Sequence, residues 1–140
     1  MRTYHVGDSE VFITDEKGKV KLQTLSHSPV AYAVESGYVD EVEAITHEER
    51  HFISNYLGRP DMHITMGSPV ILNKYDTLLL GSDGLFDNLP TDEVIEIICK
   101  GPLESRSEEL ANLVSMRMNE SGNDHPSKPD DLTFIIYRPR

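Results

Sequence analysis

The sequence predicts a single α+β domain that spans residues 1–140. Short apolar or alternating segments bounded by glycine and proline indicate β-strands near both ends of the chain and near its middle. Two consecutive amphipathic segments, 91–100 and about 105–119, indicate neighbouring helices with no strand between them. Strands and helices that are grouped in this way are typical of the α+β class. A chain of this length can also bury a hydrophobic core.

The composition restricts the classes of partner. The net charge is −11 at pH 7, which argues against binding nucleic acid or an anionic membrane through a basic face. No stretch approaches the roughly 20 apolar residues of a membrane span, and the first residues lack the apolar region of a signal peptide. The single cysteine, Cys99, excludes an intramolecular disulfide. We therefore expect a cytoplasmic protein with no nucleic-acid partner and no membrane partner.

Residues 4–24 predict a β-hairpin. The first strand covers 4–13, and Gly7-Asp8-Ser9 interrupts it as a bulge. A turn follows at 14–19. Apolar residues then alternate with polar ones from 20 to 24, as in a half-exposed strand. Residues 30–42 carry no pattern from which a structure follows.

The segment 45–57 predicts a helix. Thr46 with Glu49 three residues later matches a capping box, and a glycine and a proline just beyond the segment would end the helix. Short strands are expected at 62–66 and 70–72. The apolar face of the helix would consist of Phe52, Ile53, Tyr56 and Leu57.

An apolar strand at 77–80 leads into a tight turn and an acidic residue. The unbroken run is typical of a strand that is buried on both faces. Gly81 and Gly84 would let the chain turn sharply and let a ligand approach the backbone. A carboxylate at the end of a buried strand is costly unless a cation or hydrogen-bond donors compensate it. We therefore predict that Asp83 is a metal ligand.

The C-terminal third predicts two helices and a closing strand. Thr91 is a suitable N-cap for the helix at 91–100. Ser105, with a glutamate three residues later, matches a second capping box that opens a helix to about residue 119. A polar loop then leads to a strand at 132–137.

Two acidic clusters adjoin the predicted strands. Asp83 and Asp87 follow the strand at 77–80, and Asp130 and Asp131 come directly before the closing strand. Hard cations such as Mg²⁺ and Mn²⁺ prefer carboxylate oxygens, so Asp83 and Asp130 could share a site if the two strands are neighbours. On residue types alone, the alternative is that Asp83 fills a turn and Asp130 lies in a solvated loop.

The sequence His47-Glu48-Glu49-Arg50-His51 also matches the HExxH zinc pattern. That pattern would put His47 and His51 on one helical face beside a glutamate base. The capping box instead places His47 at the first helical position, and the third histidine of the extended motif is missing. A zinc hydrolase at 47–51 is therefore the less favoured alternative.

Five stretches, in order along the chain, resemble motifs of the metal-dependent protein phosphatases, the PPM-type or type 2C serine/threonine phosphatases. Each stretch is short, but the ordered set spans nearly all of the chain. The family's first-half motifs, such as D-G-x-G-G, do not occur, so the chain resembles the C-terminal half of the domain. The stretches are Val6–Ser9, Ile45–Glu49 followed by Asn55–Gly58, Asp76–Leu80, Gly81–Asp87 and Asp130–Thr133.

The resemblance implies half of an α/β/β/α sandwich, in which antiparallel sheets are flanked by helices. It also implies hydrolysis of phosphoserine and phosphothreonine in protein substrates by water activated between two Mn²⁺ or Mg²⁺ ions, with a third ion in some members. By position, Asp83 and Asp130 would each bind a metal ion. Asp87 and Asp131 would bind the third ion or support the ligands.

The absence of the first-half motifs affects the activity that we expect from the chain alone. No catalytic side chain is expected in this half, because the nucleophile would be a metal-bound water. Since the first-half ligands are absent, we expect little or no phosphatase activity from the 140-residue chain. A non-catalytic module for binding or regulation is the alternative. Apolar surface left open in half a sandwich also predicts self-association.

Overall fold

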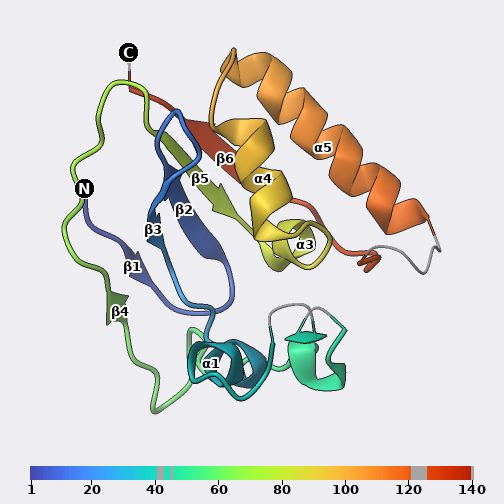
Figure 1. Cartoon of the computed structure of the whole chain (residues 1–140). Helices are drawn as coiled ribbons and strands as arrows, with labels where there is room; N and C mark the ends of the chain where they lie inside the picture. The colour runs from blue at the N-terminus through green and yellow to red at the C-terminus, as the bar shows by residue number, and fades with distance from the viewer. Residues whose placement is uncertain (41–42, 45, 121–125, 140) are drawn as a thin grey trace.

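The computed structural model describes residues 1–40, 43–44, 46–120 and 126–139. It has antiparallel sheets and helices (Figure 1), which confirms the α+β class. A four-stranded sheet has the order β3-β2-β5-β6, and β1 pairs with β4 in a separate two-stranded sheet. The predicted first strand is therefore divided at Gly7-Asp8-Ser9, because β1 (Tyr4–His5) and β2 (Glu10–Thr14) belong to different sheets.

The central strand β5 (Thr77–Gly81) fixes the position of the acidic clusters. It pairs antiparallel with β2 on one side and with β6 (Phe134–Tyr137) on the other. The predicted hairpin is present, because β3 (Val20–Gln23) pairs with β2. Since β5 and β6 run in opposite directions, the end of β5 lies beside the start of β6. The chain just after β5 therefore meets the chain just before β6.

Two helices, α4 (Thr91–Ile98) and α5 (Leu103–Asn119), cover one face of the main sheet (Figure 1). Both were predicted, but their N-caps are Pro90 and Pro102. A proline fits there because the first turn of a helix needs no N–H partner within the helix. None of the helices in the described part of the chain is long and apolar enough to cross a membrane. The core between helices and sheet includes Phe12, Leu79, Leu85, Val94, Ile98, Leu110 and Val114.

The opposite face of the sheet is partly open. Successive side chains of a strand point to opposite faces, so Leu79 is fully buried while its neighbour Leu80 is 41% exposed. Ile135, which pairs with Leu80, is 60% exposed. The expectation that the strand is buried on both faces is therefore wrong, because the described residues leave the face with Leu80 and Ile135 exposed. The predicted self-association through open apolar surface stays a prediction.

The predicted helix at 45–57 is wrong. A single 3-10 turn, η1 (Glu48–His51), stands in its place, and position 45 lies outside the described residues. Thr46 donates its hydroxyl to the Glu43 carbonyl and does not cap the turn, while the His47 ring accepts the Glu49 N–H. An amphipathic helix needs a surface on which to bury its apolar face. Among the described residues, no such surface covers Phe52, whose side chain is 52% exposed.

The remaining elements lie beside the main sheet. A short helix, α1 (Pro29–Glu35), begins where the Ser28 hydroxyl accepts the Ala31 N–H. Strand β4 (Thr65–Met66) is all that forms of the strand expected at 62–66, and no strand forms at 70–72. With β1, β4 makes the separate ladder that Figure 1 shows at the edge of the molecule.

A buried histidine joins these smaller elements. His27 accepts hydrogen bonds at Nδ1 from the Gly7 N–H, at 3.1 Å, and from the Asn55 amide, at 2.9 Å. Its ring stacks on His5, with centroids 4.3 Å apart. Burial and the neighbouring imidazoles of His5 and His63 lower the pKa of His27. The neutral ring is therefore favoured, in agreement with its role as an acceptor.

Candidate metal centre

Asp83 is the first residue of the short helix α3 (Asp83–Phe86), directly after the central strand. One carboxylate oxygen accepts the Gly84 N–H at 2.9 Å. The side chain is partly buried. The turn after the strand therefore carries a carboxylate that is hydrogen-bonded to the neighbouring backbone.

The loop that carries Asp130 lies against this turn. The Ser82 N–H donates to the Thr133 carbonyl at 2.9 Å. A Cβ at Gly84 would lie 2.4 Å from the Asp131 carbonyl oxygen, so only glycine allows this approach. The sequence predicted a close approach at this glycine, with a ligand as the approaching group. In the structure the approaching group is the backbone of the second acidic cluster.

The two predicted metal ligands act on each other electrostatically. Burial raises the pKa of Asp83, and the nearby carboxylates Asp8, Asp130 and Asp87 raise it further, while Lys128 opposes them. Asp8 was missed as a site residue, because Gly7-Asp8-Ser9 was interpreted as a bulge. The pairing of Glu10 with Gly81 explains its place, since Asp8 precedes Glu10 by two residues at the same end of the sheet.

Asp87 is held by two cations. Its carboxylate accepts from Arg50 Nε and from Lys128 Nζ, each at 2.6 Å. Arg50 also donates to the Phe86 carbonyl at 2.8 Å, which fixes η1 to α3. Because both Asp87 oxygens already have positive partners, the contacts favour the supporting role over a third metal site. Asp131 contributes through its backbone, since its N–H donates to the Asp130 carboxylate at 2.8 Å.

Lys128 places a positive charge beside the two predicted ligands, since it contacts Asp130 and acts on Asp83. It pairs with Asp87 at 2.6 Å and with Asp130 at 3.7 Å. Burial lowers the pKa of Lys128, but its hydrogen bond to Asp87 and the surrounding carboxylates outweigh this effect and raise it. The ammonium group therefore stays charged and partly balances the acidic cluster.

The donor chemistry of this site fits Mg²⁺ or Mn²⁺, which prefer carboxylate oxygens. The carboxylates that the structure describes at the site are too few to complete the coordination shell of such an ion. Among the described residues, no group of three or more histidine, cysteine or acidic side chains is arranged to hold a metal ion. The donor set of the described residues is therefore incomplete for a metal ion, and the assignment of Asp83 and Asp130 as ligands stays a prediction.

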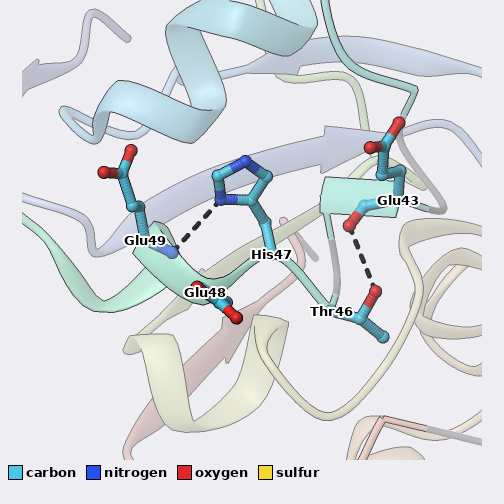
Figure 2. A pocket seen from close by; sticks show the side chains of 5 residues that line it. All are labelled: Glu43, Thr46, His47, Glu48 and Glu49. Carbon is cyan, nitrogen blue, oxygen red and sulfur yellow. Dashed lines mark hydrogen bonds between the residues drawn. The ribbon is translucent and has the colours of Figure 1, made fainter.

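The HExxH-like segment has a different geometry. His47, Glu48 and Glu49 line an open pocket together with Glu43 and Thr46, and Figure 2 shows the His47 ring directed at the Glu49 backbone N–H. A 3-10 helix has three residues per turn, so positions 47 and 51 do not share a face. The His51 ring instead contacts Phe52 in a tilted arrangement, with centroids 4.2 Å apart. This geometry gives a zinc site no support.

Glu10 is a second site neighbour that the sequence did not reveal. Burial raises its pKa to about 7, and Asp87 and Asp8 add to this, whereas Gln23 and Arg50 oppose it. The Gln23 amide donates to its carboxylate at 3.3 Å. Because the folded pKa lies above the unfolded one, the stability that Glu10 contributes is present below about pH 4.5. It is lost as the pH rises through about 7.

Glu10→Gln should therefore raise the free energy of unfolding at pH 8 and leave it nearly unchanged at pH 4.5. We expect a gain of roughly 1–3 kcal/mol at pH 8, reduced from the full linkage value because the side chain is only partly buried. Urea unfolding at the two pH values measures the difference. The matched control is Glu16→Gln, at an exposed turn residue. Equal effects of the two substitutions at pH 8 would contradict the burial of the Glu10 charge.

Comparison with individual known proteins gives matches in both sequence and structure, although the comparison with family models does not. No model of a protein family matches the sequence. A putative protein phosphatase 2C-type of Streptococcus pyogenes is 30% identical over 119 residues, which cover 81% of this chain and 46% of the relative. Protein phosphatase PhpP of Streptococcus pneumoniae is 30% identical over 112 residues, which cover 79% of this chain and 45% of the relative.

Solved structures agree. The serine/threonine phosphatase Stp1 of Staphylococcus aureus matches with a TM-score of 0.79 and 28% identity, over 99% of this chain and 51% of that one. The S. agalactiae serine/threonine phosphatase matches with a TM-score of 0.77 and 25% identity, over 98% and 53%. The chain thus spans about half the length of the relatives it matches. In sequence and in fold, it belongs to the type 2C (PPM-type) serine/threonine phosphatase family, as a portion that fits the C-terminal half of the domain.

Proposed function

We propose that this chain supplies part of a metal centre that removes phosphate from phosphoserine and phosphothreonine in proteins, with Asp83 and Asp130 as ligands of Mn²⁺ or Mg²⁺. The observation that carries the proposal is the convergence of carboxylates at the end of β5. The ionised form of Asp83 is costly because the side chain is partly buried and lies near the charges of Asp8, Asp130 and Asp87. The positive charge of Lys128 reduces this cost. A divalent cation would remove that cost.

The chain's own residues would hold and orient the centre. Asp83 and Asp130 would present carboxylate oxygens from the segment just after β5 and from the segment before β6. Arg50 and Lys128 would keep Asp87 engaged, so that it supports α3. When bound, the cations would polarise the phosphoryl group and lower the pKa of water. A structure of the same fold, the catalytic domain of PstP at 20% identity, holds 2 manganese ions, so this fold accommodates such a pair.

The chain alone should show little or no phosphatase activity, because Asp83 and Asp130 do not complete a coordination shell. A phosphothreonine peptide with Mn²⁺ and release of inorganic phosphate is the assay. No release above the background without protein is expected. Clear Mn²⁺-dependent turnover by the 140-residue chain would contradict this incompleteness.

A chimera tests the proposed chemistry itself. In it, this chain replaces the matching segment of the S. pyogenes relative, which covers 46% of that protein. We expect Mn²⁺-dependent phosphate release that Asp83→Asn abolishes. A chimera that folds and binds Mn²⁺ but releases no phosphate would instead favour a non-catalytic binding or regulatory module.

A further inference from the structure

Asn88 lies fully buried beneath the candidate metal centre. Its amide nitrogen donates to the Gly84 carbonyl and to the Lys128 carbonyl, each at 2.9 Å. Its amide oxygen accepts the Lys128 N–H at 2.7 Å. A buried amide is costly unless its donors and acceptor are satisfied. Its two hydrogen bonds with Lys128 join the end of the helix that carries Asp83 to the loop that carries Asp130, and its third bonds that helix itself.

The loop needs such a connection. Residues 126–133 form no helix or strand, so no backbone ladder of their own fixes their position. Asn88 holds the loop at residue 128. Ser82 holds it again further on, through contacts of 3.3 Å with the Asp131 carbonyl and the Thr133 N–H. Asp130 lies between these two attachments.

Electrostatic repulsion acts against this placement. The charges of Asp130, Asp8 and Asp87 all act on the carboxylate of Asp83 and raise its pKa. Like charges that are brought together in a partly buried place repel one another. Lys128 offsets part of the repulsion, at 3.7 Å from Asp130. Without a cation, the loop would move away from α3 unless uncharged hydrogen bonds held it.

We propose that Asn88 is a positioning residue, which holds the Asp130 loop against the Asp83 helix and so sets the spacing of the two metal ligands before the cation binds. This inference rests on the proposed function, because it assigns a role relative to the metal that Asp83 and Asp130 would share. The amide acts through backbone groups and contacts no cation. Removing the amide should therefore weaken metal binding by more than the accompanying loss of overall stability would cause.

The test compares two buried asparagines in the full chain. Asn55 makes a similar set of hydrogen bonds, to His27 and to the N–H and carbonyl of His63. Asn88→Leu and Asn55→Leu thus each remove three hydrogen bonds, one set at the site and one set away from it. A milder variant, Asn88→Ser, keeps a hydroxyl that can bond the Gly84 carbonyl but is too short to reach Lys128. It preserves the helix contact and removes only the loop contact.

Mn²⁺ titration by calorimetry, together with amide hydrogen exchange, gives the readouts. We expect Asn88→Leu and Asn88→Ser to raise the Mn²⁺ dissociation constant by about tenfold or more, the usual effect of losing a partner behind a ligand. Asn55→Leu should change it by less than about twofold. The Lys128 amide should exchange faster only in the Asn88 variants.

The outcomes separate the two proposals. Folded Asn88 variants that bind Mn²⁺ as tightly as the unmodified chain would overturn the positioning role and leave the metal assignment standing. An unmodified chain that binds no Mn²⁺ would overturn the metal assignment, and the positioning role with it. Equal losses of Mn²⁺ affinity in Asn88→Leu and Asn55→Leu would show a general effect of destabilisation and would also overturn the inference.

Discussion

Asp83→Asn should abolish measurable Mn²⁺ binding and, in the absence of metal, make the chain more stable at pH 7. Loss of a direct ligand should raise the dissociation constant by more than about 100-fold, since partners behind the ligands alone account for 10–100-fold. Stability should rise because the folded pKa of Asp83 lies above its unfolded value of 3.8. The stability that Asp83 contributes is thus present below that value and is lost as the pH rises through the folded pKa.

Asparagine keeps the shape of the side chain and can still accept the Gly84 N–H, so the local geometry should survive. Calorimetric titration with Mn²⁺ and thermal unfolding without metal measure the two effects. The matched control is Asp92→Asn, an exposed acidic residue in the first turn of α4. It should leave Mn²⁺ affinity unchanged. A metal-free Asp83→Asn chain that melts below the unmodified chain at pH 7 would contradict the account of the buried charge.

Phe12→Ala should lower the free energy of unfolding by about 3–5 kcal/mol. Phe12 is fully buried, pairs with Leu79 at the centre of the sheet and stacks on Phe86, with ring centroids 6.3 Å apart. Domains of this kind have a total stability of only about 5–15 kcal/mol. The substitution therefore removes a large fraction of what keeps the chain folded, and urea unfolding should show a much lower midpoint.

The control for this change is Phe52→Ala, which deletes the same ring from a residue that is 52% exposed. Its effect should stay within about 0.5 kcal/mol. The sequence placed Phe52 on the buried face of a helix, so the pair also tests the corrected structure of this segment. A loss at Phe52 equal to the loss at Phe12 would contradict the structure there.

Local patterns predicted most of the elements around the site. The helices α4 and α5 follow from apolar residues at helical spacing, and β5 and β6 from short apolar runs. The helix starts were displaced, because Thr91 suits an N-cap and Ser105 matches a capping box, while the prolines before them took the cap positions. The sequence indicated that Asp83 and Asp130 would converge if their strands were neighbours, and β5 does pair with β6.

Other features depend on contacts between distant residues. The segment around Thr46 has local signals of a helix, but its apolar side chains remain exposed, as Phe52 and Leu57 show at 52% and 74% exposure. Asn88 lies 40 residues from its partner Lys128, and Glu10 meets Arg50 and Asp87 only in the folded chain. Polar residues of this kind have no periodicity, so the sequence alone gives no signal for them. The register of β2 on β5 is what brings Asp8 and Glu10 to the site.

The most direct test of the metal centre is Mn²⁺ titration of the chain followed by NMR, because the paramagnetic ion broadens signals of nearby nuclei. The convergence of Asp83 and Asp130 predicts that broadening begins at the amides of Ser82–Gly84 and of Asp130–Asp131. Signals of the His47–His51 segment should broaden only at higher Mn²⁺ concentrations. Broadening that begins at His47 and His51, or that affects the whole chain without preference, would contradict the shared site.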